Sequence, residues 1–310
     1  MSAVTTRTNA SKGLRHSRRA PGPNQSRTGY LFIAPFIVLF ATLFIVPLLY
    51  AAYFSLFKQQ IVGGSTFAGL ENYARALRDP LLLDGVWKVA QFFVLQVPVM
   101  LVLALAAALA IDSGLLRASK VFRLGVFVPY AVPSVVAALM WGYLYGRDFG
   151  PFAQLAQTLG FQSPDFLSAG FVLPSLANIV TWSLTGYNMI ILYAALRAIP
   201  TDLYEAAAMD GAGPWRVAWS IKIPALRPAL VLCLIFSVIG AFQLFAEPNL
   251  IQRLAPSVIS SSFTPNLYAY TLAFTGQQVN YAAAVSFLLG LIIVVVSFFV
   301  LFLTNRKARS

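Results

Sequence analysis

The amino-acid sequence predicts an all-α integral membrane protein with six transmembrane helices, and two observations carry this prediction. The chain of 310 residues is 59% hydrophobic and only 10% charged, with a mean hydropathy of +0.75. One soluble core cannot bury that much apolar surface. Six segments are also long and apolar enough to cross a bilayer, which takes about 20 mostly apolar residues.

The segment 1–28 precedes the first span and differs from it in composition. It carries 6 basic residues among Ser, Thr, Gly and Pro, without apolar periodicity, as is typical of a disordered segment. The pair Arg18-Arg19 raises the alternative of a twin-arginine export signal. The apolar run that follows is much longer than the roughly 7–15 residues of a signal-peptide core. We therefore expect a disordered basic tail and a retained first span.

The predicted spans contain prolines and glycines that predict kinks and close helix packing. Pro129 and Pro133 interrupt the third span, Gly186 lies in the fourth and Gly240 in the fifth. Such residues are tolerated where neighbouring helices satisfy the backbone, and they fit a moving pathway and ordinary packing alike. The predicted spans are 29–57, 86–111, 124–146, 171–196, 229–246 and 281–304, followed by a short end at 305–310.

The distribution of Lys and Arg predicts that both termini face the cytoplasm. With the amino terminus inside, the tail, the 112–123 loop, the 197–228 loop and the carboxyl end hold 16 of the 22 basic residues. Basic residues favour the cytoplasmic face of a membrane. This orientation explains the net charge of +12 better than nucleic acid does, because no basic stripe carries interleaved aromatic residues. Membrane lipid, and no nucleic acid, is the expected partner.

The most distinctive stretch is EAAAMDGAGPWRVAWSIKIP, residues 205–224 in the 197–228 loop. Asp202 and Glu205 have the spacing of a capping box, which predicts the start of a short helix. Gly211 supplies a left-handed residue that ends this helix, and Pro214 suits the first turn of a second one. The residues alone leave two interpretations open: a docking element for a cytoplasmic protein, or an interfacial pair of helices whose tryptophans lie among lipid headgroups.

The same stretch resembles the EAA loop of permease subunits in binding-protein-dependent ABC importers. That pattern reads Glu-Ala-Ala, three residues, Gly, nine residues, Ile, any residue, Leu, Pro, and this chain departs from it only in having Ile223 for Leu. In that family the loop forms a coupling helix in a cleft of the ATPase. The residues that the resemblance assigns to ATPase coupling, together with the nearby acid Asp210, are Glu205, Ala206, Ala207, Asp210, Gly211, Ile221 and Pro224.

The resemblance covers most of the chain beyond the tail and points to the carbohydrate branch of the family. Residues 67–92, 129–160 and 182–212 are similar to its external loops and middle spans, although Trp87 and Lys88 replace the usual Asn-Thr and no Gly-Gly-Pro turn follows the fifth span. It implies a type I, maltose-permease-like fold over 29–304, with the coupling loop at 197–228.

The resemblance also implies an assembly in a bacterial inner membrane. This chain would form half of a sugar pathway beside a second homologous permease. Two ATPase subunits would use ATP and Mg, and an extracytoplasmic solute-binding protein would deliver the solute. A secondary carrier that couples the solute to an ion is the alternative, but this chain has essentially no ionisable residue mid-span and no clear repeat.

No enzyme site is predicted. None of the lysines lies in a Walker A pattern, the only histidine is His16 in the tail, and no cluster has the spacing of a metal site or a catalytic triad. Cys233, the single cysteine, lies in an apolar run and is expected to pack there. We therefore predict no catalytic residue, no metal site and no cofactor bound by this chain, and a membrane-embedded enzyme is the weakest alternative.

Candidates for the sugar path are polar and aromatic side chains in the fourth and fifth spans. Sugars bind to aromatic faces and hydrogen-bonding groups, which are costly to bury in a bilayer. For each residue, hydrogen bonding between helices is the alternative. Glu247, an acid near an external span end, is expected to be solvated or paired with Arg253. The candidates are Asn178, Trp182, Tyr187, Asn188, Ser237 and Gln243.

Overall fold

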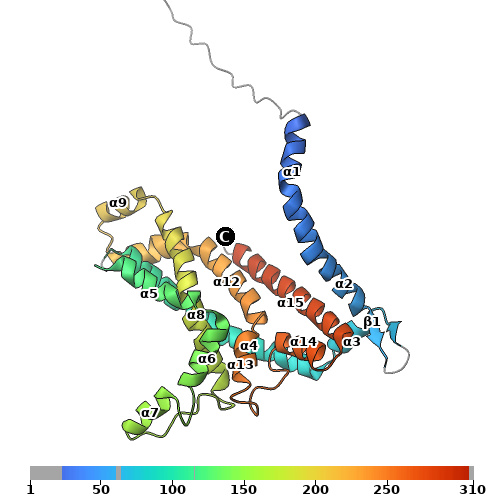
Figure 1. Ribbon diagram of the computed structural model, residues 1–310. Coiled ribbons are helices and arrows are strands. Elements are labelled where there is room, and N and C mark those ends of the chain that lie inside the picture. Colours follow the sequence, from blue (N-terminus) through green and yellow to red (C-terminus); the bar gives the residue numbers. More distant parts are fainter. Residues whose placement is uncertain (1–22, 61–63, 115, 307–310) are drawn as a thin grey trace, which may run out of the picture. The chain divides into compact units, whose positions relative to one another are not determined.

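The computed structural model describes residues 23–60, 64–114 and 116–306, and it is mostly helical (Figure 1). It divides into two units, Met1–Tyr50 and Ala51–Ser310. The predicted tail lies outside the described residues up to residue 22. From Pro23 onward the tail is helical instead, because proline is well suited to the first position of a helix.

The described part of the first unit is helical, and its last helix continues along the chain into the second unit. Helix α1 (Pro23–Phe40) is followed by the π-turn η1 (Ala41–Ile45) and by α2 (Val46–Ser55). Residues Gly29–Ser55 are long and apolar enough to span a membrane, and none of the side chains in the most hydropathic part is buried. The π-turn comes just before Pro47, where it relieves the clash between the proline ring and the preceding turn.

The second unit begins with a short hairpin and a long span. Strands β1 (Phe57–Gln59) and β2 (Ser65–Phe67) pair antiparallel, with Phe57 opposite Phe67. Helix α3 (Glu71–Ala76) follows, and then α4 (Pro80–Asp112), whose N-cap Asp79 accepts a hydrogen bond from Leu81 N. The remaining helices are α5 (Ser119–Ala131), α6 (Ser134–Leu144), α7 (Pro151–Thr158), α8 (Val172–Arg197), α9 (Asp202–Met209), α10 (Pro214–Val217), π-turn η2 (Ala218–Lys222), α11 (Ile223–Ala225), α12 (Arg227–Phe242), α13 (Ala246–Ile251), α14 (Pro265–Phe274) and α15 (Val279–Arg306).

The predicted number of six spans is confirmed if the third is counted as a broken one. Within the described residues, five helices are long and apolar enough to cross a membrane, and α5 and α6 form a sixth span bent by 96°. The bend falls at Val132, which is extended, and at Pro133, whose ψ of 137° is also far from helical. A residue before proline avoids the helical region, so the predicted kink is a full break.

Helix α8 is the centre of the second unit and packs against α4 and α5. Gly186 of α8 faces α5 so closely that a Cβ there would lie 2.1 Å from Val126 O, which explains the predicted close packing. Cys233 is fully buried beside Met189 and Leu192 in the core shared by α4, α8 and α12, as expected of an apolar filler. Figure 1 shows α9 at one end of this unit and α7 at the other.

A polar cluster fixes the start of α4 to α14 and α15. The carboxylate Oδ2 of Asp79 accepts hydrogen bonds from Tyr268 Oη (2.8 Å) and Tyr281 Oη (2.6 Å), and Arg75 lies 3.9 Å over the ring of Tyr281. Burial alone would raise the pKa of Asp79, but the hydrogen bonds from Tyr281, Tyr268 and the backbone lower it below its usual value. Burial, together with the neighbouring carboxylate, raises the pKa of Tyr268 to about 12.

Candidate functional site

The first candidate site is the segment 202–225, which comprises α9, α10, η2 and α11. Helix α9 ends in a Schellman motif: Gly211 has φ of +71°, its N–H donates to Ala208 O (3.0 Å), and Ala212 N–H donates to Ala207 O (2.9 Å). The glycine stop and Pro214 at the start of α10 are therefore confirmed.

The predicted capping box is wrong. Thr201 is the N-cap residue of α9, and no side chain makes a capping hydrogen bond there. Asp202 lies in the first helical turn and Glu205 N–H donates to Thr201 O (3.1 Å). The helix thus starts one residue earlier than the acid spacing predicts, and the carboxylate of Glu205 is free for another partner.

The outer face of segment 202–225 is exposed and includes large apolar side chains. Met209 is 90% exposed, Trp215 79% and Trp219 65%. Glu205 is exposed as well and makes no hydrogen bond or ion pair with another described residue. Ala206 lies beside it on α9. An exposed face of this kind is typical of a surface that binds a protein or a membrane.

Three of the predicted coupling residues meet in a notch between α9 and the helix that follows. Ala207, Asp210 and Ile221 line a pocket of about 180 Å³. Pro224 lies in α11 directly after the π-turn η2, and the π-turn accommodates this proline as η1 accommodates Pro47.

A largely buried ion pair anchors segment 202–225 to the end of α4. Lys222 Nζ lies 2.6 Å from Asp112 Oδ2, and the two side chains are 15% and 8% exposed. The same ammonium lies 5.3 Å from the ring centre of Tyr204. Burial raises the pKa of Tyr204, and the negative charge of Asp112 adds to this. The anchor joins residues that are far apart in sequence, and sequence reasoning missed it.

The second candidate site is a cavity of about 720 Å³, here called the span cavity, between α4, the α5–α6 break, α8, α12 and α13. Its polar lining side chains carry amide and hydroxyl groups and one carboxylate, and aromatic rings also line it. Its lining residues are Phe92, Gln96, Tyr130, Val132, Pro133, Ser134, Val180, Ser183, Leu184, Ser237, Gly240, Ala241, Gln243, Leu244, Phe245, Ala246, Glu247 and Asn266.

Some polar groups of the span cavity are engaged and others are free. Ser237 Oγ donates to Cys233 O (2.8 Å), and Asn266 Nδ2 donates to Gln243 O (3.3 Å). The side chains of Gln243 and Ser183 make no hydrogen bond with a described residue, and that of Glu247 makes none with a residue other than itself. Free amides, hydroxyls and a carboxylate beside aromatic rings are suited to a polar ligand with apolar faces.

The structure divides the six predicted sugar-path residues. Ser237 and Gln243 line the span cavity. Tyr187 lies behind its wall and stacks on the lining residue Tyr130, with ring centres 4.8 Å apart. Asn188 instead packs between helices, where it donates to Leu184 O (3.0 Å).

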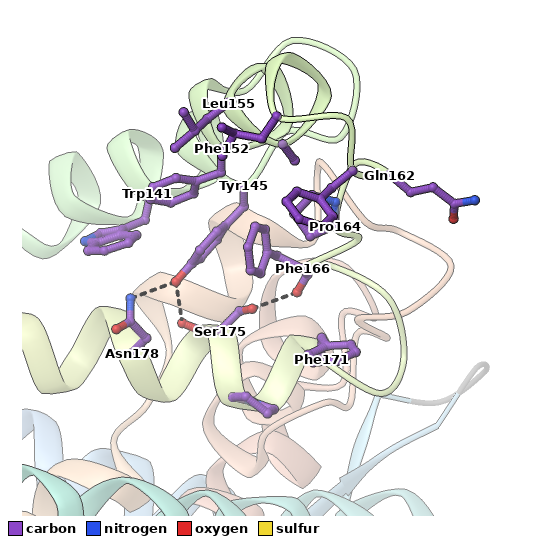
Figure 2. Close-up of a pocket in the computed structure, with 14 residues that line it drawn as sticks. Trp141, Tyr145, Phe152, Leu155, Gln162, Pro164, Phe166, Phe171, Ser175 and Asn178 are labelled. Atoms are coloured by element: carbon purple, nitrogen blue, oxygen red, sulfur yellow. Dashed lines mark hydrogen bonds between the residues drawn. The ribbon is translucent and has the colours of Figure 1, made fainter.

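The other two predicted residues, Trp182 and Asn178, lie towards the α7 end. Trp182 meets Trp141 edge to face, with ring centres 5.9 Å apart. Asn178 lines a separate cavity of about 760 Å³ under α7, where it donates to Tyr145 Oη (2.8 Å) and Ser175 Oγ donates to Phe166 O (2.7 Å) (Figure 2). That cavity is mostly apolar, and these hydrogen bonds fix the loop to α8.

Sequence reasoning missed most of the span-cavity lining. Gln96, Tyr130, Ser183 and Asn266 lie in it, and the prolines around Tyr130 were the available signal for the break. Glu247 was expected to be solvated or paired with Arg253, but it lines the cavity and forms no ion pair with Arg253. No group of three or more potential metal-binding side chains lies close together in the described part of the chain.

Comparison with known proteins yields one family and several relatives. Residues 116–309 match the family "Binding-protein-dependent transport system inner membrane component". The lactose transport system permease protein LacF of Rhizobium radiobacter is 31% identical, over 87% of this chain and 91% of the relative. The sn-glycerol-3-phosphate transport system permease protein UgpA of Salmonella typhimurium is 29% identical, over 86% and 90%.

A solved structure has the same fold. A chain of a bacterial alginate ABC transporter, solved in complex with an alginate pentasaccharide-bound periplasmic protein, superposes with a TM-score of 0.81 over 93% of this chain and 97% of that chain, at 18% identity.

Proposed function

We propose that this permease subunit, which belongs to the family of binding-protein-dependent transport system inner membrane components, forms half of the translocation pathway of an ATP-driven sugar importer. It is a multi-pass membrane protein of the bacterial inner membrane and a transport subunit rather than an enzyme. The secondary-carrier alternative has no support, because the relatives are permeases of ABC systems.

The span cavity is the observation that carries the proposal. It lies where the third span is broken and where α12 ends, so its walls belong to several different spans. Irregular backbone at membrane depth is tolerated where it lines a cavity or is covered by protein. A second, homologous permease is proposed to close the open side of the cavity.

Segment 202–225 is the proposed contact with the ATPase subunits. Its exposed Glu205, Met209 and Trp215 offer one charge and two apolar anchors, while the Asp112–Lys222 pair fixes it to the spans. Two ATPase subunits would hydrolyse Mg-ATP, and this segment would pass their movement on. With that contact, the segment and both termini are proposed to be cytoplasmic, which the distribution of basic residues supports.

The sugar class is proposed from the relatives and from the lining. The relatives are named as permeases of lactose and sn-glycerol-3-phosphate transport systems. The aromatic rings, amides and hydroxyls that line the span cavity are groups that bind sugars. The alginate transporter was solved with a periplasmic protein, which supports delivery by an extracytoplasmic solute-binding protein.

Filling the span cavity tests the proposal. Gly240 lines it, and a Cβ there meets no atom within 4 Å, so Gly240→Leu occupies the path without straining the helix. For whichever sugar of a panel the wild-type assembly imports into proteoliposomes, we expect uptake to fall at least about tenfold. Gly290→Leu is the control, because Gly290 on α15 also has open space but lies outside the cavity.

Both variants should assemble with their partners at wild-type yield. Normal uptake by an assembled Gly240→Leu variant would show that the solute takes another path.

A further inference from the structure

The charge of the span cavity has a consequence for the kind of solute that it accepts. Glu247 is the carboxylate among its 18 lining residues, and none of those residues is Lys, Arg or His. The side chain is half-buried and makes no ion pair or hydrogen bond with another described residue. When it is ionised, this carboxylate therefore has no cationic partner within the described part of this chain.

We propose that Glu247 makes the span cavity selective for neutral or amino-bearing sugars and excludes anionic ones. An ionised carboxylate accepts hydrogen bonds from sugar hydroxyls and, more strongly, from a sugar ammonium group. A sugar phosphate, sulfonate or uronate would bring a second negative charge into a partly desolvated space, where repulsion is stronger than in water.

The remaining lining fits this solute class. The free amide of Gln243 and the free hydroxyl of Ser183 are neutral partners for sugar hydroxyls, and Tyr130 and Phe245 offer rings for the apolar face of a sugar. An anion would need a guanidinium or ammonium to replace its hydration, and the lining provides neither.

The proposed selection separates this chain from relatives of similar identity. LacF is named for a neutral sugar, lactose, and UgpA for an anionic polyol phosphate, sn-glycerol-3-phosphate. By its lining, this chain belongs with carriers of uncharged or cationic solutes. The inference rests on the proposed function insofar as the span cavity is taken as the solute path.

The electrostatic potential in the span cavity can be measured by the rates at which two thiol reagents of similar size and opposite charge react with a cysteine placed there. Gly240→Cys places a thiol in open space on the lining. Its reaction rates with the cationic trimethylammonium-ethyl and the anionic sulfonato-ethyl methanethiosulfonate are compared in the full assembly. Ser65→Cys, at an exposed position of the hairpin, provides the reference ratio, and the chain without added cysteine gives the background from buried Cys233.

We expect the cation-to-anion rate ratio at Gly240→Cys to exceed the reference ratio about tenfold or more. Adding Glu247→Gln should bring it close to the reference, whereas Glu247→Asp should keep it high. The proposal would be overturned if Glu247→Gln changed the cation-to-anion rate ratio at Gly240→Cys by less than about twofold. A basic group of the second permease that neutralises Glu247 would give this same result, because no net negative charge would then act on the cavity.

This result is independent of the test of the pathway. A large, Glu247-dependent ratio combined with normal uptake by Gly240→Leu would refute the proposed function alone. Lost uptake in Gly240→Leu combined with an unchanged ratio would refute only the charge selection.

Discussion

Gly186 permits the close approach of α8 to α5. A methyl group at this position would lie 2.1 Å from Val126 O and 2.7 Å from Phe127 Cα, so the backbones would have to separate. We expect Gly186→Ala to lower the free energy of unfolding by about 3 kcal/mol, as is found for overpacked sites. Thermal unfolding of the purified protein in detergent measures this loss.

Gly125→Ala is the control for this prediction. Gly125 lies on α5, and a Cβ at this position would meet no atom within 4 Å, so its substitution should leave the melting temperature unchanged or slightly raised. Equal melting temperatures of the two variants would contradict the close contact.

The Asp79 cluster predicts a dependence of stability on pH. The pKa of Asp79 is lowered in the folded state, so its ionised form contributes stability above the unfolded pKa of about 3.8, and this contribution is lost as the pH falls through the lower folded pKa. Tyr281→Phe removes one donor to the carboxylate and should cost about 1–2 kcal/mol at pH 7. The difference in melting temperature from wild type should shrink towards pH 3.

Tyr73→Phe is the matched control for Tyr281→Phe. Its hydroxyl bonds the neutral Ser55 (2.7 Å), so its effect on melting should not change over the same pH range. A Tyr281→Phe effect that stays constant from pH 7 to pH 3 would argue against an ionised Asp79 as its acceptor.

Single residues were predicted well where local geometry decides their role. Gly211 and Pro214 act through their own backbone conformation, so their positions in sequence sufficed. The capping box predicted for Asp202 and Glu205 was wrong because Thr201, which is also suited to the N-cap position, takes that position instead. Glu247 was misplaced because its neighbours in the cavity come from helices far away in sequence.

Among the structural elements, segment 202–225 depends on its anchor to α4. Removing one partner of a buried ion pair leaves an unpaired charge and typically costs 3–5 kcal/mol. We expect Lys222→Met to lower the free energy of unfolding by about 3 kcal/mol, and the double variant Asp112→Leu with Lys222→Met to regain most of that loss. Thermal or denaturant unfolding of the purified chain measures both.

Lys88→Met is the comparison for the anchor. Lys88 pairs with Asp84 at 2.6 Å on one helix, but the Asp84 side chain is 52% exposed, and such surface pairs contribute at most about 1 kcal/mol. If Lys222→Met cost no more than Lys88→Met, the Asp112–Lys222 pair would not be the anchor.

The elements themselves were predictable because each span is long and continuously apolar. The exception is the third span, where the two prolines predicted a kink but not the 96° bend between α5 and α6. The size of the bend depends on what α6 packs against, namely α13 and α8, and neither contact is visible in the local sequence.

At the scale of the whole molecule, α12 connects the two candidate sites. It begins just after segment 202–225 and ends at the span cavity, and its 16 residues span about 24 Å at 1.5 Å per residue. A stiff helix of this length transmits a displacement at one end to the other. The sequence predicted both ends of this connection, but the cavity itself is made by contacts between distant segments.

This connection through α12 predicts that a substitution at Glu205, in segment 202–225, stops transport through the distant span cavity. We expect Glu205→Lys to abolish sugar uptake and the stimulation of ATP hydrolysis by the binding protein, because the exposed acid at α9 faces the proposed ATPase. Asp148→Lys makes the same charge change at an exposed position near α7 and should leave the coupling intact. Wild-type uptake by Glu205→Lys would remove this charge from the docking contact.

The π-turn Ala218–Lys222 determines in which direction around the helix axis the exposed face of α10 points relative to the anchor at Lys222. A π-turn holds one residue more than an α-turn, which corresponds to a rotation of about 100° around the helix axis. Trp215 therefore points in a direction that an uninterrupted α-helix would not give it while Lys222 reaches Asp112. Homologous loops that differ by one residue here would present a differently rotated face to the same neighbour.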